Sequence, residues 1–347
     1  MDANLDIQID EALNAYRASG VEDQVDYQKF YLYSIVTHST AIEGSTVTEI
    51  ENQLLFDEGI AAKGRSLTEQ IMNVDLKDAY LYAFGIASEN PTYTPQLLQQ
   101  LATLVMRRTG SEYSTIAGHF DSSKGEFRLC NVSAGIGGRS YLAYNKVPRA
   151  VDDFCRWLNE EISKVDKINI ATCYRLSFEA HFRLVTIHPW VDGNGRTTRL
   201  VMNLIQRQLG LVPSIVRKED KGEYIQSLVD SRENNDSTIA QDVMLSHHIA
   251  NLNRRVLQFQ ENDTVNVQSD TVNDTANSNN DTVTGLKKSL QKVYRAILNN
   301  PKITHSEIME ILHISESTAK RATRDLKKLG YIAREGSDKT GRWVIMK

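Results

Sequence analysis

Apolar residues recur every three or four positions through most of the first 260 residues, and this periodicity predicts a mainly helical body. The stretch from Tyr27 to Ile42 is one example, and Gly44 supplies its stop signal. Thr48 and Glu51 form a capping-box pattern that predicts the start of the next helix. The predicted helices span Tyr27–Ile42, Glu49–Phe56, Leu67–Ala87, Val151–Ile162, Ile168–Ile187 and Arg196–Leu209.

One segment of the body departs from the helical pattern. The stretches Glu126–Val132 and Ser140–Asn145 flank glycines at positions 135, 137 and 138. Because glycine permits the backbone conformations of tight turns, this pattern predicts a β-hairpin with a glycine-rich tip. An ordinary edge hairpin and a binding element both stay open for it.

A change of composition marks the end of the body. Residues 260–284 are rich in Asn, Asp, Thr and Ser, and such a stretch buries too little apolar area to order itself, so it is predicted to be a flexible linker. Beyond it the helical pattern resumes over Leu286–Asn299, Ser306–Leu312 and Ser317–Leu329, followed by predicted strands Tyr331–Arg334 and Arg342–Met346. The third helix is expected to turn four residues inward, namely Ala319, Ala322, Leu326 and Leu329.

The charge divides at the same linker. The 347-residue chain carries a net charge of -4, but residues 285–347 hold 14 Lys and Arg against 6 Asp and Glu, a net of +8. The remainder therefore carries -12. An acidic body and a basic tail domain are predicted.

The tail pattern, three helices and a hairpin, resembles a winged helix-turn-helix. Its third helix is expected to expose Lys320, Arg321, Arg324, Lys327 and Lys328, as a helix that reads a DNA groove would. Because a fold alone does not fix a function, both DNA and a regulatory protein stay open as partners of residues 285–347.

The remaining composition favours an intracellular protein. The three cysteines lack the Cys-x-x-Cys spacing, which argues for reduced thiols in a cytoplasmic setting. The first 20 residues do not resemble a signal peptide, and no run of about 18 apolar residues exists, so no membrane partner is expected.

The segment from His188 to Arg199 holds the densest set of chemically active residues. Its loop has two glycines around Asn194 between two predicted helices, so the backbone amides of residues 194–196 would lie at a helix N-terminus, which suits an anion. Arg196 and Arg199 share a helical face and fit a polyphosphate. Asp192 can hold a divalent ion, and His188 can accept a proton from an attacking hydroxyl.

Three other readings are weaker. An EF-hand is excluded because Arg196 and Thr197 stand where a calcium loop needs an oxygen ligand and a glycine. The stretch from Gly59 to Ser66 is similar to a phosphate loop but has Arg in place of the lysine and follows a helix, so a helix stop is expected there. The pair His247-His248 has no third ligand nearby, which favours a structural role.

The segment resembles the signature of the Fic family, His-x-Phe-x-(Asp/Glu)-Gly-Asn-Gly-Arg-x-x-Arg, with Trp190 in place of Phe. The resemblance covers about residues 33–252. It implies a helical fold and transfer of AMP from ATP to a Ser, Thr or Tyr hydroxyl. It also implies Asp192 as the ligand of Mg²⁺ or Mn²⁺, and His188 as the general base for the target hydroxyl.

The resemblance further assigns the nucleotide contacts. Gly193, Asn194, Gly195 and Arg196 would hold the α- and β-phosphates and Arg199 the γ-phosphate, with Thr197 and Thr198 in the same nucleotide-binding segment. Tyr224 and Ile225 would line the adenine pocket. The hairpin of residues 127–145 would be a flap that pairs with a target segment, through Val132, Ser133, Ala134 and Gly135.

A second resemblance concerns Ser39-Thr40-Ala41-Ile42-Glu43-Gly44, which is similar to the family's inhibitory motif (Ser/Thr)-x-x-x-Glu-(Gly/Asn). Ser39 and Glu43 are four apart and share one helix face. A carboxylate there would pair with Arg199 and occupy the arginine that the γ-phosphate needs. The resemblance therefore implies an inhibitory helix over about residues 28–44.

The expected fold is mainly α: an N-terminal helical region (1–110), a Fic-like catalytic core with a β-hairpin flap (111–259), a linker (260–284) and a small α+β winged helix-turn-helix domain (285–347). The expected function is an autoinhibited transfer of AMP to a hydroxyl-bearing target protein or to the chain itself. Removal of AMP by the same site through Glu43, a nucleotide-sensing DNA-binding regulator and a homodimer all stay open.

Overall fold

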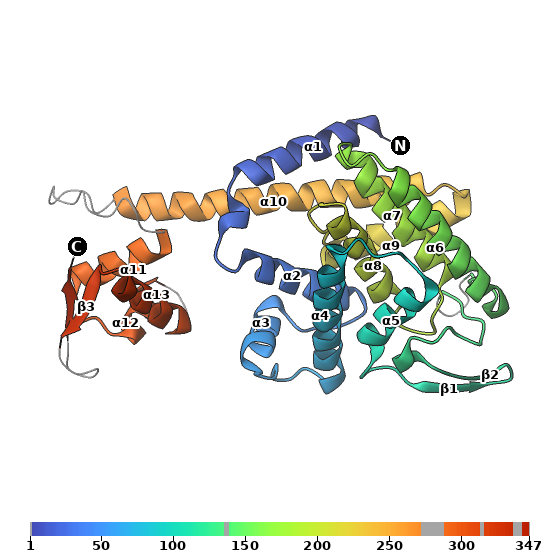
Figure 1. The fold of residues 1–347 in the computed structure, drawn as a ribbon, viewed down its shortest axis with the longest axis horizontal. Helices are drawn as coiled ribbons and strands as arrows, with labels where there is room; N and C mark the ends of the chain where they lie inside the picture. The colour runs from blue at the N-terminus through green and yellow to red at the C-terminus, as the bar shows by residue number, and fades with distance from the viewer. Residues whose placement is uncertain (1, 135–138, 272–287, 313–315, 336–341, 347) are drawn as a thin grey trace. The chain divides into compact units, whose positions relative to one another are not determined.

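The protein is described here by a computed structural model that covers residues 2–134, 139–271, 288–312, 316–335 and 342–346. It consists of two compact units, residues 1–266 and 267–347. The described residues of the first unit, called the body below, are mainly helical with a short β-hairpin, as Figure 1 shows. No helix among the described residues is long and apolar enough to span a bilayer. Its helices are α1 (Ala3–Ala18), α2 (Tyr27–Ile42), α3 (Glu49–Glu58), α4 (Leu67–Ala87), α5 (Pro95–Met106), α6 (Val147–Lys164), α7 (Ile170–Ile187), α8 (Asn194–Gln208), α9 (Lys221–Asn234) and α10 (Thr238–Thr271).

Helix α8 is the centre of the body. It packs against α7, α4 and α5. Five consecutive or neighbouring apolar side chains of α8 are fully buried: Leu200, Val201, Met202, Leu204 and Ile205. Because the helix is enclosed on several sides, the polar residues of its first turns are also held rigidly inside the protein.

Polar contacts fix the outer helices to this core. The buried Arg175 on α7 pairs with Asp6 on α1 at 2.7 Å and with Asp242 on α10 at 2.6 Å. Helix α2 is attached to α3 and α4 through the buried amides of Asn52 and Asn73. The predicted α2 and α4 boundaries are confirmed, and so is the capping box at Thr48.

Over its described residues, 126–134 and 139–145, the predicted hairpin has a single bridge in place of two extended strands. Ser133 and Ser140 form a single antiparallel bridge, beside a hydrogen bond from the Tyr141 amide to the Val132 carbonyl at 3.0 Å. The named strands of the body are instead β1 (Glu112–Thr115) and β2 (Gly118–Asp121), which pair antiparallel. The sequence pattern missed them because each strand has only four residues, too few for a clear alternation.

The predicted linker is also partly helical. Helix α10 continues to Thr271, so residues 260–271 are helical where a flexible segment was expected. A helix already packed against the body can lengthen at little cost, because each further residue adds one hydrogen bond without a new nucleus. Residues 272–284 lie outside the described residues.

The second unit has the order of a winged helix-turn-helix. It comprises α11 (Lys288–Asn299), α12 (His305–Leu312), α13 (Glu316–Lys328) and the antiparallel pair β3 (Ile332–Glu335) and β4 (Arg342–Ile345). Ala319, Ala322 and Leu326 are buried as expected, whereas Leu329 is 49% exposed. The prediction for Leu329 was wrong because α13 ends at Lys328 and the turn at Gly330 takes Leu329 off the inward stripe.

Candidate functional site

The loop between α7 and α8 is a tight backbone turn. His188 ends α7 in a left-handed conformation with φ of 53°, and Gly193 precedes α8 with φ of 76°. The side chain of Asn194 fixes the loop, because its Oδ1 accepts from the Trp190 amide at 3.1 Å and its Nδ2 donates to the Trp190 carbonyl at 2.9 Å. The first amides of α8 therefore face a preformed position for an anion.

The predicted pairing of Glu43 with Arg199 is present in the structure. The buried guanidinium of Arg199 donates to Glu43 Oε1 at 2.6 Å, to the hydroxyl of Ser39 at 2.9 Å and to the Ser39 carbonyl at 2.9 Å. Burial opposes the charge of both partners, but their mutual attraction outweighs it. The attraction between the two charges lowers the pKa of Glu43 and raises the pKa of Arg199.

The same carboxylate lies directly over the start of α8. A Cβ added to Gly195 would be 2.2 Å from Glu43 Oε1 and 3.0 Å from Arg199 Nη1. Only glycine therefore leaves room for the carboxylate at this place. A negative group at a helix N-terminus is favoured by the helix dipole, so Glu43 occupies the position that suits an anion.

Arg196 is held beside this position with unused hydrogen-bond donors. Its side chain is buried, and Nη2 contacts Met106 Sδ at 3.2 Å and lies 3.6 Å from Asp192 Oδ1. Nε and Nη1 are buried and have no acceptor among the described residues. Burial lowers the pKa of Arg196 although Asp192 and Glu43 oppose that shift. Buried donors without acceptors fit a site that an anionic ligand completes.

Asp192 and His188 are placed at the two sides of the loop. The Asp192 side chain is 62% exposed, so its free oxygen can reach a metal ion. Burial is the main cause that lowers the pKa of His188 to about 4, with the nearby Arg128 and Arg232 acting in the same direction. A neutral imidazole at pH 7 has a lone pair with which to accept a proton.

The His188 ring is fixed from two directions. Its Nδ1 lies 3.3 Å from the Val185 carbonyl, and its face stacks on Tyr141 with ring centroids 3.8 Å apart. Tyr141 was not singled out from the sequence, because its role depends on the return arm of the flap, residues 127–145, folding over the loop. With Nδ1 engaged in this way, Nε2 is the ring nitrogen that remains to accept a proton.

Trp190 does more than fill the place that Phe has in the signature. Its side chain is buried, and its Nε1–H donates to the carbonyl of Gly125 at 3.0 Å. A phenyl ring could not make that bond. The loop between α7 and α8 is thereby attached to the segment that leads into the flap, where the Phe127 ring centroid lies 6.2 Å from that of the indole.

The other residues predicted to contact the nucleotide differ in how far they are buried. Thr197 and Thr198 are fully buried, and the Thr198 hydroxyl donates to the Gly195 carbonyl at 3.1 Å. Tyr224 is buried with its hydroxyl 2.9 Å from His181 Nε2, whereas Ile225 is 43% exposed. Of the predicted flap residues, Ser133 forms the bridge with Ser140, Val132 and Ala134 flank it, and Gly135 lies outside the described residues.

The weaker sequence motifs take structural positions. Gly59 ends α3 in the left-handed conformation, which confirms the predicted helix stop. His247 contacts Glu223 at 2.9 Å, and burial lowers the pKa of His248 to about 3. Among the described residues no group of three His, Cys, Asp or Glu side chains could hold a metal ion.

Comparison with protein families gives two matches. Residues 92–206 match the Fic/DOC family, and residues 286–333 match a winged helix-turn-helix DNA-binding family. A protein named protein adenylyltransferase Fic from Drosophila erecta is 30% identical over 218 residues, which cover 62% of this chain and 40% of that protein. The protein of the same name from Drosophila melanogaster is 28% identical over 225 residues, which cover 64% of this chain and 41% of that protein. The chain thus spans about two fifths of the length of these curated relatives.

Two solved structures share the fold. A Fic domain containing signaling protein from Bacteroides thetaiotaomicron superposes with a TM-score of 0.61 at 19% identity, over 73% of this chain and 97% of the other. A Fic family protein from Desulfovibrio desulfuricans G20 has a TM-score of 0.61 at 18% identity, over 99% and 96%. At these identities the likeness establishes the fold.

Proposed function

We propose, from the premise that this chain is a Fic/DOC domain protein with a C-terminal winged helix-turn-helix domain, that it transfers AMP from ATP to a protein hydroxyl and rests in an inhibited state. The acceptor is a Ser, Thr or Tyr of a target protein or of the chain itself. The observation that carries the proposal is the Glu43 carboxylate, which lies against Gly195 at the N-terminus of α8 and is bonded to Arg199. A carboxylate from the chain itself stands where a phosphate of ATP would bind.

The residues around the loop suit each part of this reaction. In the proposed mechanism the α- and β-phosphates lie at the amides of Gly193 to Gly195 and accept from the unused nitrogens of Arg196. His188 takes the proton of the target hydroxyl while the hydroxyl oxygen bonds to the α-phosphorus. The bond between that phosphorus and the bridging oxygen breaks, and pyrophosphate leaves with the electron pair.

Asp192 fits a divalent ion, because its carboxylate is largely exposed and lies at the edge of the anion position. A bound Mg²⁺ or Mn²⁺ would neutralise charge on the phosphates. The ion is expected to complement Arg196 and the amides of α8, which position the same phosphates.

Inhibition follows from competition for one guanidinium. Three nitrogen–oxygen contacts already engage Arg199, so a γ-phosphate would have to displace the Glu43 carboxylate to reach it. Without that grip, ATP would bind with its α-phosphorus displaced from the line of attack. An error of about 1 Å in such a geometry can cost roughly 100-fold in rate.

The Glu43→Gly variant tests the proposal. A charge-assisted hydrogen bond contributes about 1.5–3 kcal/mol, so we expect its removal to raise AMP transfer at least about tenfold. The measurement is self-labelling with ATP that carries the label in the α-phosphate, together with the added AMP mass. Glu58→Gly, at the exposed end of α3, is the matched control and should leave labelling unchanged. Adding His188→Ala to Glu43→Gly should abolish labelling and spare ATP binding.

The outcomes separate the alternatives. No AMP mass from Glu43→Gly at any Mg²⁺ or Mn²⁺ level would reject transfer and leave a nucleotide-sensing role. Loss of AMP from a modified target, when incubated with the unchanged protein but not with Glu43→Gly, would favour AMP removal through Glu43. Equal labelling by the unchanged protein and by Glu43→Gly would reject the inhibition.

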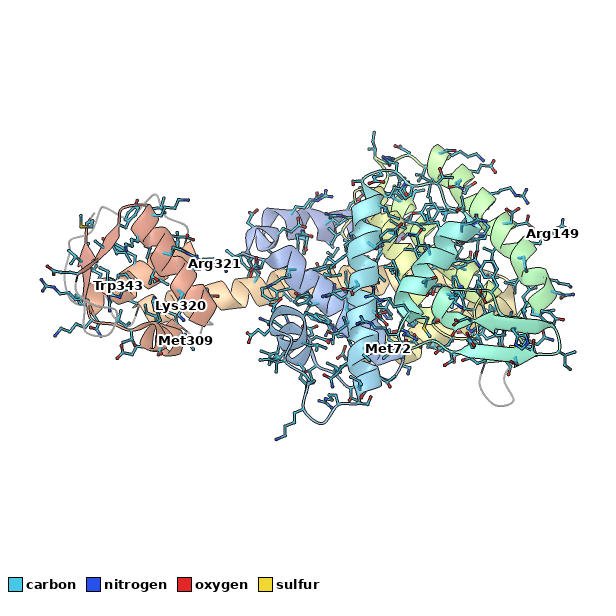
Figure 2. All side chains as sticks on the ribbon, turned by 60° about the horizontal axis from the view of Figure 1, so that its bottom comes forward. Met72, Arg149, Met309, Lys320, Arg321 and Trp343 are labelled. Atoms are coloured by element: carbon cyan, nitrogen blue, oxygen red, sulfur yellow. The ribbon has the colours of Figure 1, made fainter. Side chains whose placement is uncertain are left out.

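A second function concerns the C-terminal unit. Its α13 exposes five basic side chains, and Figure 2 labels two of them. They are Lys320, Arg321, Arg324, Lys327 and Lys328. The basic exposed face belongs to a unit that matches a DNA-binding family. Together these observations favour DNA over a regulatory protein as the partner. A gel shift that weakens as salt rises is expected, and a shift that is absent or independent of salt would favour protein docking.

A further inference from the structure

Arg128, at the start of the flap, makes an unusual set of contacts. Its side chain is completely buried, and all three of its acceptors are backbone carbonyls. Nε donates to His188 at 2.8 Å, Nη1 to Cys130 at 2.7 Å and Nη2 to Leu142 at 2.5 Å. Its own amide donates to the Pro189 carbonyl at 3.1 Å. One side chain therefore joins both arms of the flap to the loop that carries His188.

The charge of Arg128 is not needed to balance another charge. Among the residues that the structure describes, no carboxylate pairs with it, and burial lowers its pKa. Burying a cation is unfavourable unless its donors are satisfied, and an apolar side chain could fill the same volume without that cost. What the guanidinium provides and an apolar group cannot is three donors in a fixed planar arrangement.

The carbonyl that Arg128 holds belongs to a residue in an uncommon conformation. His188 has φ of 53°, in the left-handed region that residues other than glycine rarely adopt. Such a conformation persists only where the surroundings enforce it. The bond from Arg128 Nε to the His188 carbonyl is one such constraint, and it acts on the backbone of the proposed general base itself.

A second route from Arg128 leads to the His188 ring. Leu142, which Arg128 binds, follows Tyr141, whose ring stacks on the imidazole at an interplanar angle of 17°. The Arg232 guanidinium lies 5.2 Å from the Tyr141 ring centroid. Holding Leu142 in place thus holds Tyr141 against the imidazole.

We propose that Arg128 and Tyr141 are positioning residues for the general base. Arg128 clasps the flap to the catalytic loop and fixes the His188 backbone, and Tyr141 sets the plane of the imidazole so that Nε2 meets the target hydroxyl. The proposal rests on the proposed AMP transfer for the role of His188. Neither side chain is assigned a contact with ATP.

The first experiment measures turnover in the active Glu43→Gly background. Arg128→Met should lower kcat about 100-fold, because the base is no longer held in line, while the affinity for ATP changes little. Arg128→Lys keeps the charge but has one donor nitrogen in place of three, and should recover part of the rate. The matched control is Arg149→Met on α6, whose side chain is 90% exposed. Arg149 is labelled in Figure 2. A turnover of Arg128→Met equal to that of Arg149→Met would overturn the proposal.

A second pair of variants avoids the buried charge. Tyr141 is only half-buried, so Tyr141→Leu should fold, and it should lower kcat about tenfold with little change in KM for ATP. Tyr141→Phe keeps the stacked ring and should retain the rate. Equal rates for Leu and Phe at this position would overturn the part assigned to Tyr141.

A third readout does not depend on transfer. The charged groups that act on His188 are Arg128, Arg232 and Glu43, and its pKa is lowered to about 4. Removing the repulsion of Arg128 and admitting water should raise that pKa in Arg128→Met, as read from the imidazole nitrogens by NMR. The amides of Ala134 and Tyr141 should also exchange faster. If Glu43→Gly transfers no AMP, the proposed function fails, but these two measurements still test whether Arg128 holds the flap to the His188 loop. An unchanged His188 pKa together with unchanged amide exchange would refute that role.

Discussion

Replacing Trp190 with Phe, the residue of the Fic signature, tests whether the indole is a structural anchor of the loop between α7 and α8. The substitution keeps an aromatic ring in the same buried place but removes Nε1, which donates to the Gly125 carbonyl at 3.0 Å. Gly125 cannot move away to find another donor. A Cβ at this position would be 2.0 Å from the Gln99 carbonyl, which shows how closely α5 approaches it.

The expected loss of stability has two parts. A buried carbonyl left without its donor costs about 1–3 kcal/mol. The smaller phenyl ring vacates roughly 40 Å³, and at about 24 cal/mol per Å³ the cavity adds about 1 kcal/mol. We therefore expect Trp190→Phe to lower the free energy of unfolding of the body by about 2–4 kcal/mol.

Urea unfolding followed by far-ultraviolet circular dichroism measures this change, from the shift in midpoint at constant slope. Trp157→Phe is the matched control. Trp157 is half-buried and its ring faces the Arg183 guanidinium at 4.0 Å, a contact that phenylalanine can keep, so the loss should stay under about 1 kcal/mol. A Trp190→Phe loss no larger than that of the control would refute the argument, since it would mean that the bond to Gly125 contributes nothing.

Two further predictions concern the contact between Glu43 and Arg199. Ser39→Ala removes one acceptor of Arg199 but leaves the Ser39 carbonyl and Glu43, so AMP transfer should rise above that of the unchanged protein yet stay below that of Glu43→Gly. Ser34→Ala on the same helix is the control, and a Ser39→Ala rate equal to it would contradict the expectation. The second prediction is a pH dependence. The Arg199 charge lowers the pKa of Glu43, so the stability that this carboxylate contributes is present above its ordinary pKa and is lost as pH falls through the lowered folded value. The excess Tm of the unchanged protein over Glu43→Gln should therefore be present at pH 7 and shrink below about pH 4, and a constant excess across that range would reject the assignment.

The site could be predicted largely from the sequence because its chemistry is concentrated in one continuous segment. His188, Asp192, Arg196 and Arg199 are neighbours along the chain, and a loop between two helices needs no distant partner to present them on one side. The pairing of Glu43 with Arg199 was also within reach, because each lies in its own recognisable motif.

The sequence pattern did not predict three features of the structure. These are the short β1–β2 hairpin, the helical conformation of residues 260–271 and the exposure of Leu329. Each depends on where an element meets its neighbours or its end, and local periodicity does not record that. A four-residue strand is fixed by its partner strand, and a helix terminus by what it packs against.

By itself, then, the sequence determined the helical body, the basic C-terminal unit and the order of chemical groups from His188 to Arg199. Only the tertiary structure decided what holds those groups in place. Arg128, Tyr141 and Gly125 lie far from α8 in sequence, and nothing in their local pattern distinguishes them from ordinary flap and loop residues. Their roles exist because folding brings carbonyls, a ring and a guanidinium within hydrogen-bond or stacking distance, and such short-range interactions have no energy until that approach has occurred.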